Sequence, residues 1–231
     1  MPVEARRSFH QQLDEVKVDV VRLGALVLDA IPRGTAVLLD GDVVGAQRLI
    51  DDDDVLNELE RAIEDQCFHL LALQAPVASD MRALVTAIRL ASELERSGDL
   101  VANIAKGARR MVGTTIDPRT RGLIQQLSDE AARLFGVAMD AYADGDGAMA
   151  AALNDMDDGL DELHREFIAQ ILESCRAGQL EVQAAVQLAL IGRYDERIGD
   201  HAVNVGERVR YMVTGALPDR PERVPLSEPP A

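Results

Sequence analysis

Apolar residues along this 231-residue chain recur at the three- and four-residue spacing of amphipathic helices, and no stretch sustains the alternation of a β-strand. The pattern predicts an all-α fold of six long helices. Their expected ranges are Arg6–Asp40, Asp42–Gln74, Pro76–Gly113, Pro118–Asp144, Asp146–Arg176 and Leu180–Thr214. The residues after Gly215 are rich in proline and polar side chains, which predicts a disordered tail over residues 215–231.

Two prolines bear on where the helices begin and end. Pro76 suits the first turn of the third expected helix, where a missing backbone N–H does no harm. Pro32 lies inside the first expected helix, in the run Ile31-Pro32-Arg33-Gly34. An internal proline removes a helical hydrogen bond and clashes with the preceding turn. We therefore expect the first helix to be kinked or broken there.

The sequence repeats itself across its two halves, which is the signature of a duplicated supersecondary unit. Asp40-Gly41-Asp42 returns as Asp144-Gly145-Asp146, and Leu49–Leu59 returns at the same offset, 104 positions later, as Leu153–Leu163. Glu95–Asp99 (ERSGD) returns as Glu196–Asp200 (ERIGD), now 101 positions later. The change in offset falls between the second and third helices of each half, where a loop can absorb it. The repeat predicts two similar three-helix bundles, over residues 1–114 and 115–214, related by pseudo-two-fold symmetry.

Composition and charge narrow the classes of function. The apolar residues are mainly Ala, Leu, Val and Ile, with no Trp and only four Phe and three Tyr, which fits long packed helices better than a β-sandwich. The formal net charge of −16, without a basic stripe, excludes nucleic acid as a direct partner. The acidity instead suits metal ions or a basic partner surface.

The chain also carries no sign of membrane insertion or export. No apolar run approaches the roughly 20 residues of a membrane-spanning helix. The first ten residues lack the apolar core of a signal peptide. We therefore expect a soluble, cytoplasmic protein.

Each half carries two pairs of oxygen-bearing side chains spaced four residues apart. Residues at this spacing share one helical face, so two carboxylates placed there repel each other unless something offsets their charge. We interpret these pairs as candidate metal ligands: Asp53 with Asn57, Glu95 with Asp99, Asp157 with Asp161, and Glu196 with Asp200. Oxygen ligands suit divalent or trivalent ions, so iron, manganese, magnesium or zinc is expected in preference to copper.

A plainer interpretation competes with metal binding. The acids could be a solvated face, paired with neighbouring bases, of which the candidates are Arg96, Arg193, Arg197 and Lys106. Recurrence of the pairs in both halves favours metal sites. Gly98 and Gly199 lie inside helices beside the motif acids, at a cost of about 1 kcal/mol each relative to alanine. Tolerated strain and a close approach of helices, or room for an ion, explain these glycines equally well.

Histidines and catalytic motifs add little. His164 lies one turn beyond Asp161 on the same helical face, and the sequence favours a surface or packing role for it over a ligand role. His201 follows Asp200 but points away from it around the helix. Neither half contains the Glu-x-x-His pair of a ferritin-like di-iron centre. Nucleophile motifs and phosphate-binding glycine loops are also missing from the sequence.

The repeated motifs carry a family resemblance. Leu94–Asn103 (LERSGDLVAN) and its counterpart Tyr194–Asn204 (YDERIGDHAVN) resemble the paired E-R-x-G-D signature of the PhoU family. Pro76–Arg82 (PVASDMR) resembles the proline element that precedes the family's third helix. Leu190–Gly215 is especially similar to actinobacterial members. The resemblance covers about residues 8–217, which is nearly the whole chain.

The resemblance implies two three-helix bundles, a cytoplasmic protein that is often a homodimer, and metal clusters at E(D)xxxD motifs. Glu95, Asp99, Glu196 and Asp200 match these motifs directly. Asp157 with Asp161 matches the partner motif of the second half, and Asp53 with Asn57 matches its first-half counterpart. The second half has Ala177–Gln183 (AGQLEVQ) in place of the proline element, and the Ile31–Gly34 run in the first helix is a further departure from the pattern.

The implied role is to hold down the phosphate-starvation response when phosphate is plentiful. The implied partners are the ATPase subunit of the phosphate transporter and a phosphate-sensing histidine kinase. The leading hypothesis is therefore a non-catalytic, metal-binding signalling adaptor. A metal-dependent hydrolase or oxidase that uses carboxylate-bound ions is the second hypothesis. A helical scaffold without metal is the third.

Overall fold

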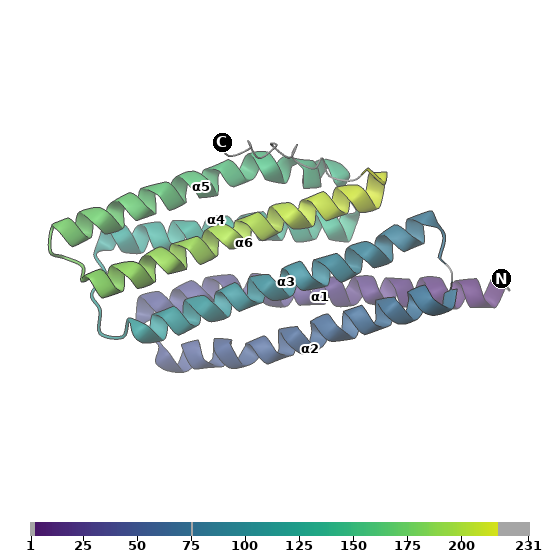
Figure 1. Ribbon diagram of the computed structural model, residues 1–231, viewed down its shortest axis with the longest axis horizontal. Helices are drawn as coiled ribbons and strands as arrows, with labels where there is room; N and C mark the ends of the chain where they lie inside the picture. The colour runs from purple at the N-terminus through teal and green to yellow at the C-terminus, as the bar shows by residue number, and fades with distance from the viewer. Residues whose placement is uncertain (1–2, 75, 217–231) are drawn as a thin grey trace, which may run out of the picture.

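The predicted all-α fold with six long helices is confirmed by the computed structural model, which describes residues 3–74 and 76–216. The helices are α1 (Val3–Asp40), α2 (Val43–Gln74), α3 (Ala78–Arg110), α4 (Pro118–Asp144), α5 (Gly147–Arg176) and α6 (Val182–Thr214). Figure 1 shows all six lying along the long axis of the molecule, with α1–α3 on one side and α4–α6 on the other. None of the helices in the described part of the chain is long and apolar enough to cross a membrane.

The predicted boundaries are close to those observed. The third helix begins at Ala78, just after Pro76, and the sixth begins at Val182 instead of Leu180. Gly215 ends α6 in the left-handed conformation, with φ of 76° and its N–H bonded to Tyr211 O. The tail predicted over residues 215–231 lies outside the described residues, apart from Gly215 and Ala216.

The expected break of the first helix at Pro32 is wrong, since α1 continues as one helix from Val3 to Asp40. Tertiary contacts on either side of the proline explain why the helix persists. Arg33 donates to Asp29 in its own helix and to Asp52 of α2. Gly34 lies so close to α3 that a Cβ there would be 3.2 Å from Val101 Cγ1. One lost backbone hydrogen bond is offset by this packing against α2 and α3.

The two helix turns that the repeat predicts have the same local structure. Gly41 and Gly145 both adopt φ of 66°, a left-handed conformation that side chains with a Cβ disfavour. Asp42 Oδ1 accepts hydrogen bonds from two backbone amides at the start of α2, at 3.1 and 2.9 Å. Asp146 Oδ1 does the same at the start of α5, at 2.8 and 3.0 Å. Each Gly-Asp pair therefore ends one helix and caps the next.

The two halves pack against each other along α3 with α6 and along α1 with α4. Glycine allows close approach at this interface, because a Cβ on Gly107 of α3 would lie 3.1 Å from Ile191 of α6. A buried polar contact between Ser97 and His201 joins the same two helices. The helices that carry the E-R-x-G-D motifs are therefore the ones that meet at the centre of the molecule.

Candidate functional site

In the first half, α2 and α3 place the predicted residues side by side. Asn57 Nδ2 donates to Asp53 O at 3.0 Å and approaches the Asp53 carboxylate at 3.4 Å, so both belong to one face of α2. Asp53 Oδ1 approaches α3, at 3.9 Å from where a Cβ on Gly98 would lie. Asp53 Oδ1 is buried and has no hydrogen-bond partner among the described residues.

The pKa values of the first-half acids respond to acids on both α2 and α3. Burial raises the pKa of Asp53, and the nearby charge of Asp99 raises it further, while Lys106 acts in the opposite direction. Burial is also the main reason why the pKa of Glu95 is raised, followed by Asp99, Glu60 and Asp53. Asp53, Glu95 and Asp99 therefore form one cluster, which we call the first carboxylate site together with Asn57 and Glu60.

The second half repeats this arrangement on α5 and α6. Burial raises the pKa of Asp157 to about 6, with further contributions from Asp200 and Asp161. The pKa of Glu196 is raised as well, chiefly by burial and by Asp200. Glu196 is only 9% exposed, and its Oε2 has no hydrogen-bond partner among the described residues. We call these four acids the second carboxylate site.

Among the four basic residues that could pair with the acids, Arg193 alone forms an ion pair with them in the described part of the chain. Arg193 contacts Glu196 Oε1 through Nη1, and its Nη2 lies 4.0 Å from Asp200 Oδ2. In the first half, Lys106 donates to Asn103 at 3.4 Å. Pairing with neighbouring bases therefore explains part of the second site. It does not explain the buried oxygens Asp53 Oδ1 and Glu196 Oε2, which have no hydrogen-bond partner among the described residues.

Gly98 and Gly199 allow each pair of helices to approach closely at its carboxylate site. A Cβ on Gly98 would overlap Leu56 of α2, and a Cβ on Gly199 would overlap Leu160 of α5. The Gly199 Cβ would also lie 2.8 Å from Asp157 Oδ1. Of the two explanations that the sequence leaves open, the structure thus favours close approach over tolerated strain.

The acids of each site lie in one region without closing around a single point. Within residues 3–74 and 76–216, no group of three or more His, Cys, Asp or Glu side chains is arranged as the ligands of one metal ion. The assignment of Asp53, Asn57 and the six other residues as metal ligands stays a prediction.

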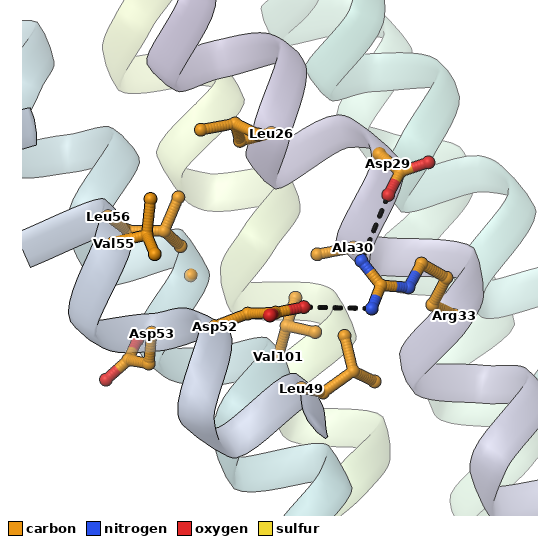
Figure 2. A pocket seen from close by; sticks show the side chains of 11 residues that line it. Leu26, Asp29, Ala30, Arg33, Leu49, Asp52, Asp53, Val55, Leu56 and Val101 are labelled. Atoms are coloured by element: carbon orange, nitrogen blue, oxygen red, sulfur yellow. Dashed lines mark hydrogen bonds and ion pairs between the residues drawn. The ribbon is translucent and has the colours of Figure 1, made fainter. Parts of the chain in front are cut away.

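A pocket of about 170 Å³ lies beside the first site, between α1, α2 and α3. Arg33 of α1 spans its mouth and donates to Asp29 at 3.1 Å and to Asp52 of α2 at 2.9 Å (Figure 2). Asp52 points toward Arg33, whereas Asp53 points away from it. Val137 occupies the position of Arg33 in the second half. The Arg33 bridge therefore ties α1 to the α2 turn that carries Asp53 in the first half.

Two acids were not singled out in the sequence: Glu60 of the first site, and Asp195, which belongs to neither site. Glu60 lies seven positions after Asp53, two helical turns along the same face, so helical periodicity could have found it. Asp195 is fully buried, and neither carboxyl oxygen has a hydrogen-bond partner in the described residues. Burial raises the pKa of Asp195 to about 8. No sequence signal marked this residue, because it lies among the other charged residues of α6.

Comparisons with known proteins agree with this architecture. A family model described as the PhoU domain matches residues 20–108 and 124–209, one match in each half. The chain is 35% identical over 215 residues to phosphate-specific transport system accessory protein PhoU homolog 1 of Mycobacterium leprae, covering 93% of this chain and 96% of that protein. It is 36% identical over 214 residues to PhoU homolog 2 of Mycobacterium bovis, covering 92% of this chain and all of the relative.

Solved structures are similar over the same length. The crystal structure of PhoU from Pseudomonas aeruginosa aligns with a TM-score of 0.84 at 27% identity, covering 90% of this chain and all of that one. The phosphate transport system regulatory protein PhoU from Streptococcus pneumoniae gives the same TM-score and identity over 92% of this chain. These proteins are named as accessory and regulatory proteins, which agrees with the prediction of a non-catalytic protein. With a family match in each repeat and relatives above 30% identity along nearly its whole length, the chain belongs to the PhoU family.

Proposed function

We propose that this protein is a cytoplasmic, metal-binding adaptor that regulates phosphate uptake and holds down the phosphate-starvation response. It acts by contact with the ATPase subunit of a phosphate transporter and with a sensor histidine kinase. The observation that carries the proposal is the family match in both repeats, which extends over the helices that hold the carboxylate sites. Relatives named as accessory proteins of the phosphate-specific transport system support the phosphate role.

The residues of the two sites fit hard or borderline cations. Asp53 Oδ1 and Glu196 Oε2 are buried oxygens without a hydrogen-bond partner in the described residues, and such atoms favour a bound cation. Raised pKa values at Asp53, Glu95, Asp157 and Glu196 show that burial and neighbouring charge disfavour the ionised acids. A cation would reverse that effect by offsetting the charge. Asp53, Asn57, Glu95 and Asp99 would hold it in the first half, and Asp157, Asp161, Glu196 and Asp200 in the second.

Bound metal would supply charge neutralisation and would cross-link helices. Each site takes acids from two helices, α2 with α3 and α5 with α6, so an ion bound there couples the two. Because α3 packs on α6 at the centre of the molecule, the site-bearing helices also form the contact between the halves. Metal occupancy would therefore stiffen the surfaces that a partner protein meets.

We also propose that the protein is a homodimer. Phe68 of α2 exposes 55% of its surface, and its repeat counterpart Leu172 of α5 exposes 51%. Large apolar side chains exposed at equivalent places in both repeats are suitable contacts for another chain. Light scattering on the purified protein measures this directly against the monomer mass of 25.1 kDa. A monomer at all concentrations would contradict the dimer and would leave the adaptor role intact.

The regulatory role is tested by deleting the gene from its own organism and following a phosphate-starvation reporter in phosphate-rich medium. The reporter is expected to turn on in the deletion strain and to be silenced again by the wild-type protein. A reporter that stays off, in a strain with no second family member, would contradict the proposed role.

Metal binding is tested separately by elemental analysis of three proteins: wild type, Glu95→Ala/Asp99→Ala and Glu196→Ala/Asp200→Ala. Stoichiometric metal that falls by about half in each double variant is expected from two independent sites. No metal above background after reconstitution would mean that the acids form a solvated face. The adaptor role would then rest on protein contacts alone.

A further inference from the structure

The two carboxylate sites differ at one ligand position. At the repeat offset of 104 that relates Leu49–Leu59 to Leu153–Leu163, Glu60 of the first half corresponds to His164 of the second. Glu60 belongs to the first site, because it lies two helical turns after Asp53 on the same face of α2. The same repeat position therefore carries an oxygen donor, Glu60, in the first half and a nitrogen donor, His164, in the second.

His164 lies beside the acids of the second site. The position of a Cβ on Gly192 of α6 would be 3.4 Å from His164 Cδ2, so the imidazole packs where α5 approaches α6. Its Nε2 is buried and has no hydrogen-bond partner among the described residues. Asp161 lies one helical turn before His164 on the same face of α5, and Glu196 lies one turn after Gly192 on α6. A buried imidazole nitrogen without a hydrogen-bond partner, on the helical face that also carries Asp161, is chemically suited to a metal ion.

A carboxylate oxygen of the second site, on the facing helix α6, is also unpaired in the described part of the chain. Glu196 is nine-tenths buried and leaves Oε2 without a hydrogen-bond partner in the described residues. Its other oxygen, Oε1, contacts Arg193. Buried carboxylate oxygens normally have partners, so unpaired Glu196 Oε2 on α6 and unpaired His164 Nε2 on α5, on helices that pack together, favour a shared cation.

Charge does not distinguish the two sites. The first has four acids, Asp53, Glu60, Glu95 and Asp99, with Lys106 nearby, and the second has Asp157, Asp161, Glu196 and Asp200 with Arg193 nearby. Four negative charges and one positive charge give a formal −3 in each. The donor type is what differs, since oxygen ligands suit magnesium and manganese whereas an imidazole favours zinc, cobalt and iron(II).

We propose that the two sites select different metal ions: the first takes a hard ion on oxygen ligands alone, and the second takes a borderline ion such as Zn²⁺ with His164 Nε2 as a ligand. This inference rests on the proposed metal binding. If so, the two repeats of one chain bind different metal ions.

The test uses full-length proteins that keep one site each. Glu196→Ala/Asp200→Ala keeps the first site, and Glu95→Ala/Asp99→Ala keeps the second. The dissociation constants for Mn²⁺ and Zn²⁺ are measured in competition with a chelating dye. Zn²⁺ binds more tightly than Mn²⁺ to most ligand sets, so the quantity compared is the ratio of the two constants. The preference for Zn²⁺ is expected to be at least about tenfold larger at the second site.

Exchanging the differing residue is the matched control. His164→Glu in the second-site protein is expected to reduce its Zn²⁺ preference to that of the first site, and Glu60→His in the first-site protein is expected to raise it. Circular dichroism checks that each variant folds. NMR of the four histidine side chains gives a second measurement, because Zn²⁺ should shift the His164 ring signals and leave those of His10 and His69 in place.

Three outcomes would overturn the inference. Equal selectivity at the two sites contradicts it, as does a preference that His164→Glu leaves unchanged, or a His164 ring that Zn²⁺ does not perturb. In each of these cases metal still binds, so the proposed function survives. Failure of both ions to bind the wild-type protein contradicts the proposed metal binding and this inference together.

Discussion

Ser97 Oγ lies 3.0 Å from His201 Nδ1 in a buried contact that joins α3 to α6 across the two halves. The Ser97 hydroxyl also donates to Glu93 O at 2.9 Å, so it accepts from His201, whose Nδ1 carries the proton in this network. Burial lowers the pKa of His201 and keeps the ring neutral. The repeat counterparts of the pair are Ile198 and Leu100, which are also buried. One side of the pseudo-symmetric interface is therefore polar and the other apolar.

Removing the acceptor of this hydrogen bond should weaken the interface. Ser97→Ala leaves His201 Nδ1 buried without a partner, which is expected to reduce the free energy of unfolding by about 1–3 kcal/mol. Ser97→Ile/His201→Leu copies the counterpart pair and is expected to recover most of that loss, because no polar group remains unpaired. Urea unfolding of both variants measures the difference. A double variant less stable than Ser97→Ala would show that the polar contact is required for packing.

Adding a methyl group at the motif glycines should separate the helices. Gly98→Ala and Gly199→Ala place a Cβ against Leu56 and Leu160, and overpacking of this kind is expected to destabilise the protein by about 1–3 kcal/mol. Gly122→Ala in α4 is the matched control, since nothing lies within 4 Å of its Cβ position. That change should stabilise the protein by up to about 1 kcal/mol through helix propensity. Thermal unfolding measures the stability of the three variants. Stabilisation of all three would contradict a close approach of the helices at Gly98 and Gly199.

The buried acid Asp195 should make stability depend on pH. Burial raises its pKa in the folded protein to about 8, against about 3.9 in the unfolded chain. Its contribution to stability is therefore fully present below about pH 4 and is lost as the pH rises towards about 8. Asp195→Leu, which copies the counterpart residue Leu94, should stabilise the metal-free protein more at about pH 8 than at about pH 5. Urea unfolding at both pH values measures this, and an equal gain at both would contradict an ionising Asp195.

Arg193 should compete with cations at the second site. It contacts Glu196 and lies 4.0 Å from Asp200, and the residue at its position in the first half is Ser92. Arg193→Ser is expected to tighten Zn²⁺ binding at the second site by roughly fivefold, equivalent to about 1 kcal/mol for a half-exposed ion pair. Arg197→Ser removes the same charge from an exposed position and is the control. Similar effects of both changes on the dissociation constant would mean that only overall charge matters.

Metal binding at the second site should weaken in acid. The pKa of Asp157 is raised to about 6, so protons compete with metal as the pH falls through that value. In a protein that keeps only the second site, Zn²⁺ affinity is expected to fall at least several-fold from about pH 7 to about pH 5. Asp157→Asn should bind more weakly at about pH 7 and show a shallower pH dependence. An affinity that does not change over this range would exclude Asp157 as a ligand.

The helices, the repeat and the placing of paired acids on single helical faces all follow from local features of the sequence. Apolar spacing marks each helix because one face of it is buried, and Gly41 and Gly145 mark turns because they need a left-handed backbone. Spacing of four places Glu95 with Asp99, and Glu196 with Asp200, on single helical faces without knowledge of any other helix. These features are local, so the chain alone specifies them.

Which helical faces meet, and how deeply each residue is buried, depends on the packing of the six helices. Pro32 stays inside α1 because contacts with α2 and α3 hold both sides of it. Asp195 is buried where the matching residue of the other repeat is Leu94, and His164 packs against α6 at Gly192 with its Nε2 buried. The physical reason is that burial and pairing depend on helices far apart in the sequence, and periodicity within one helix carries no information about its neighbour.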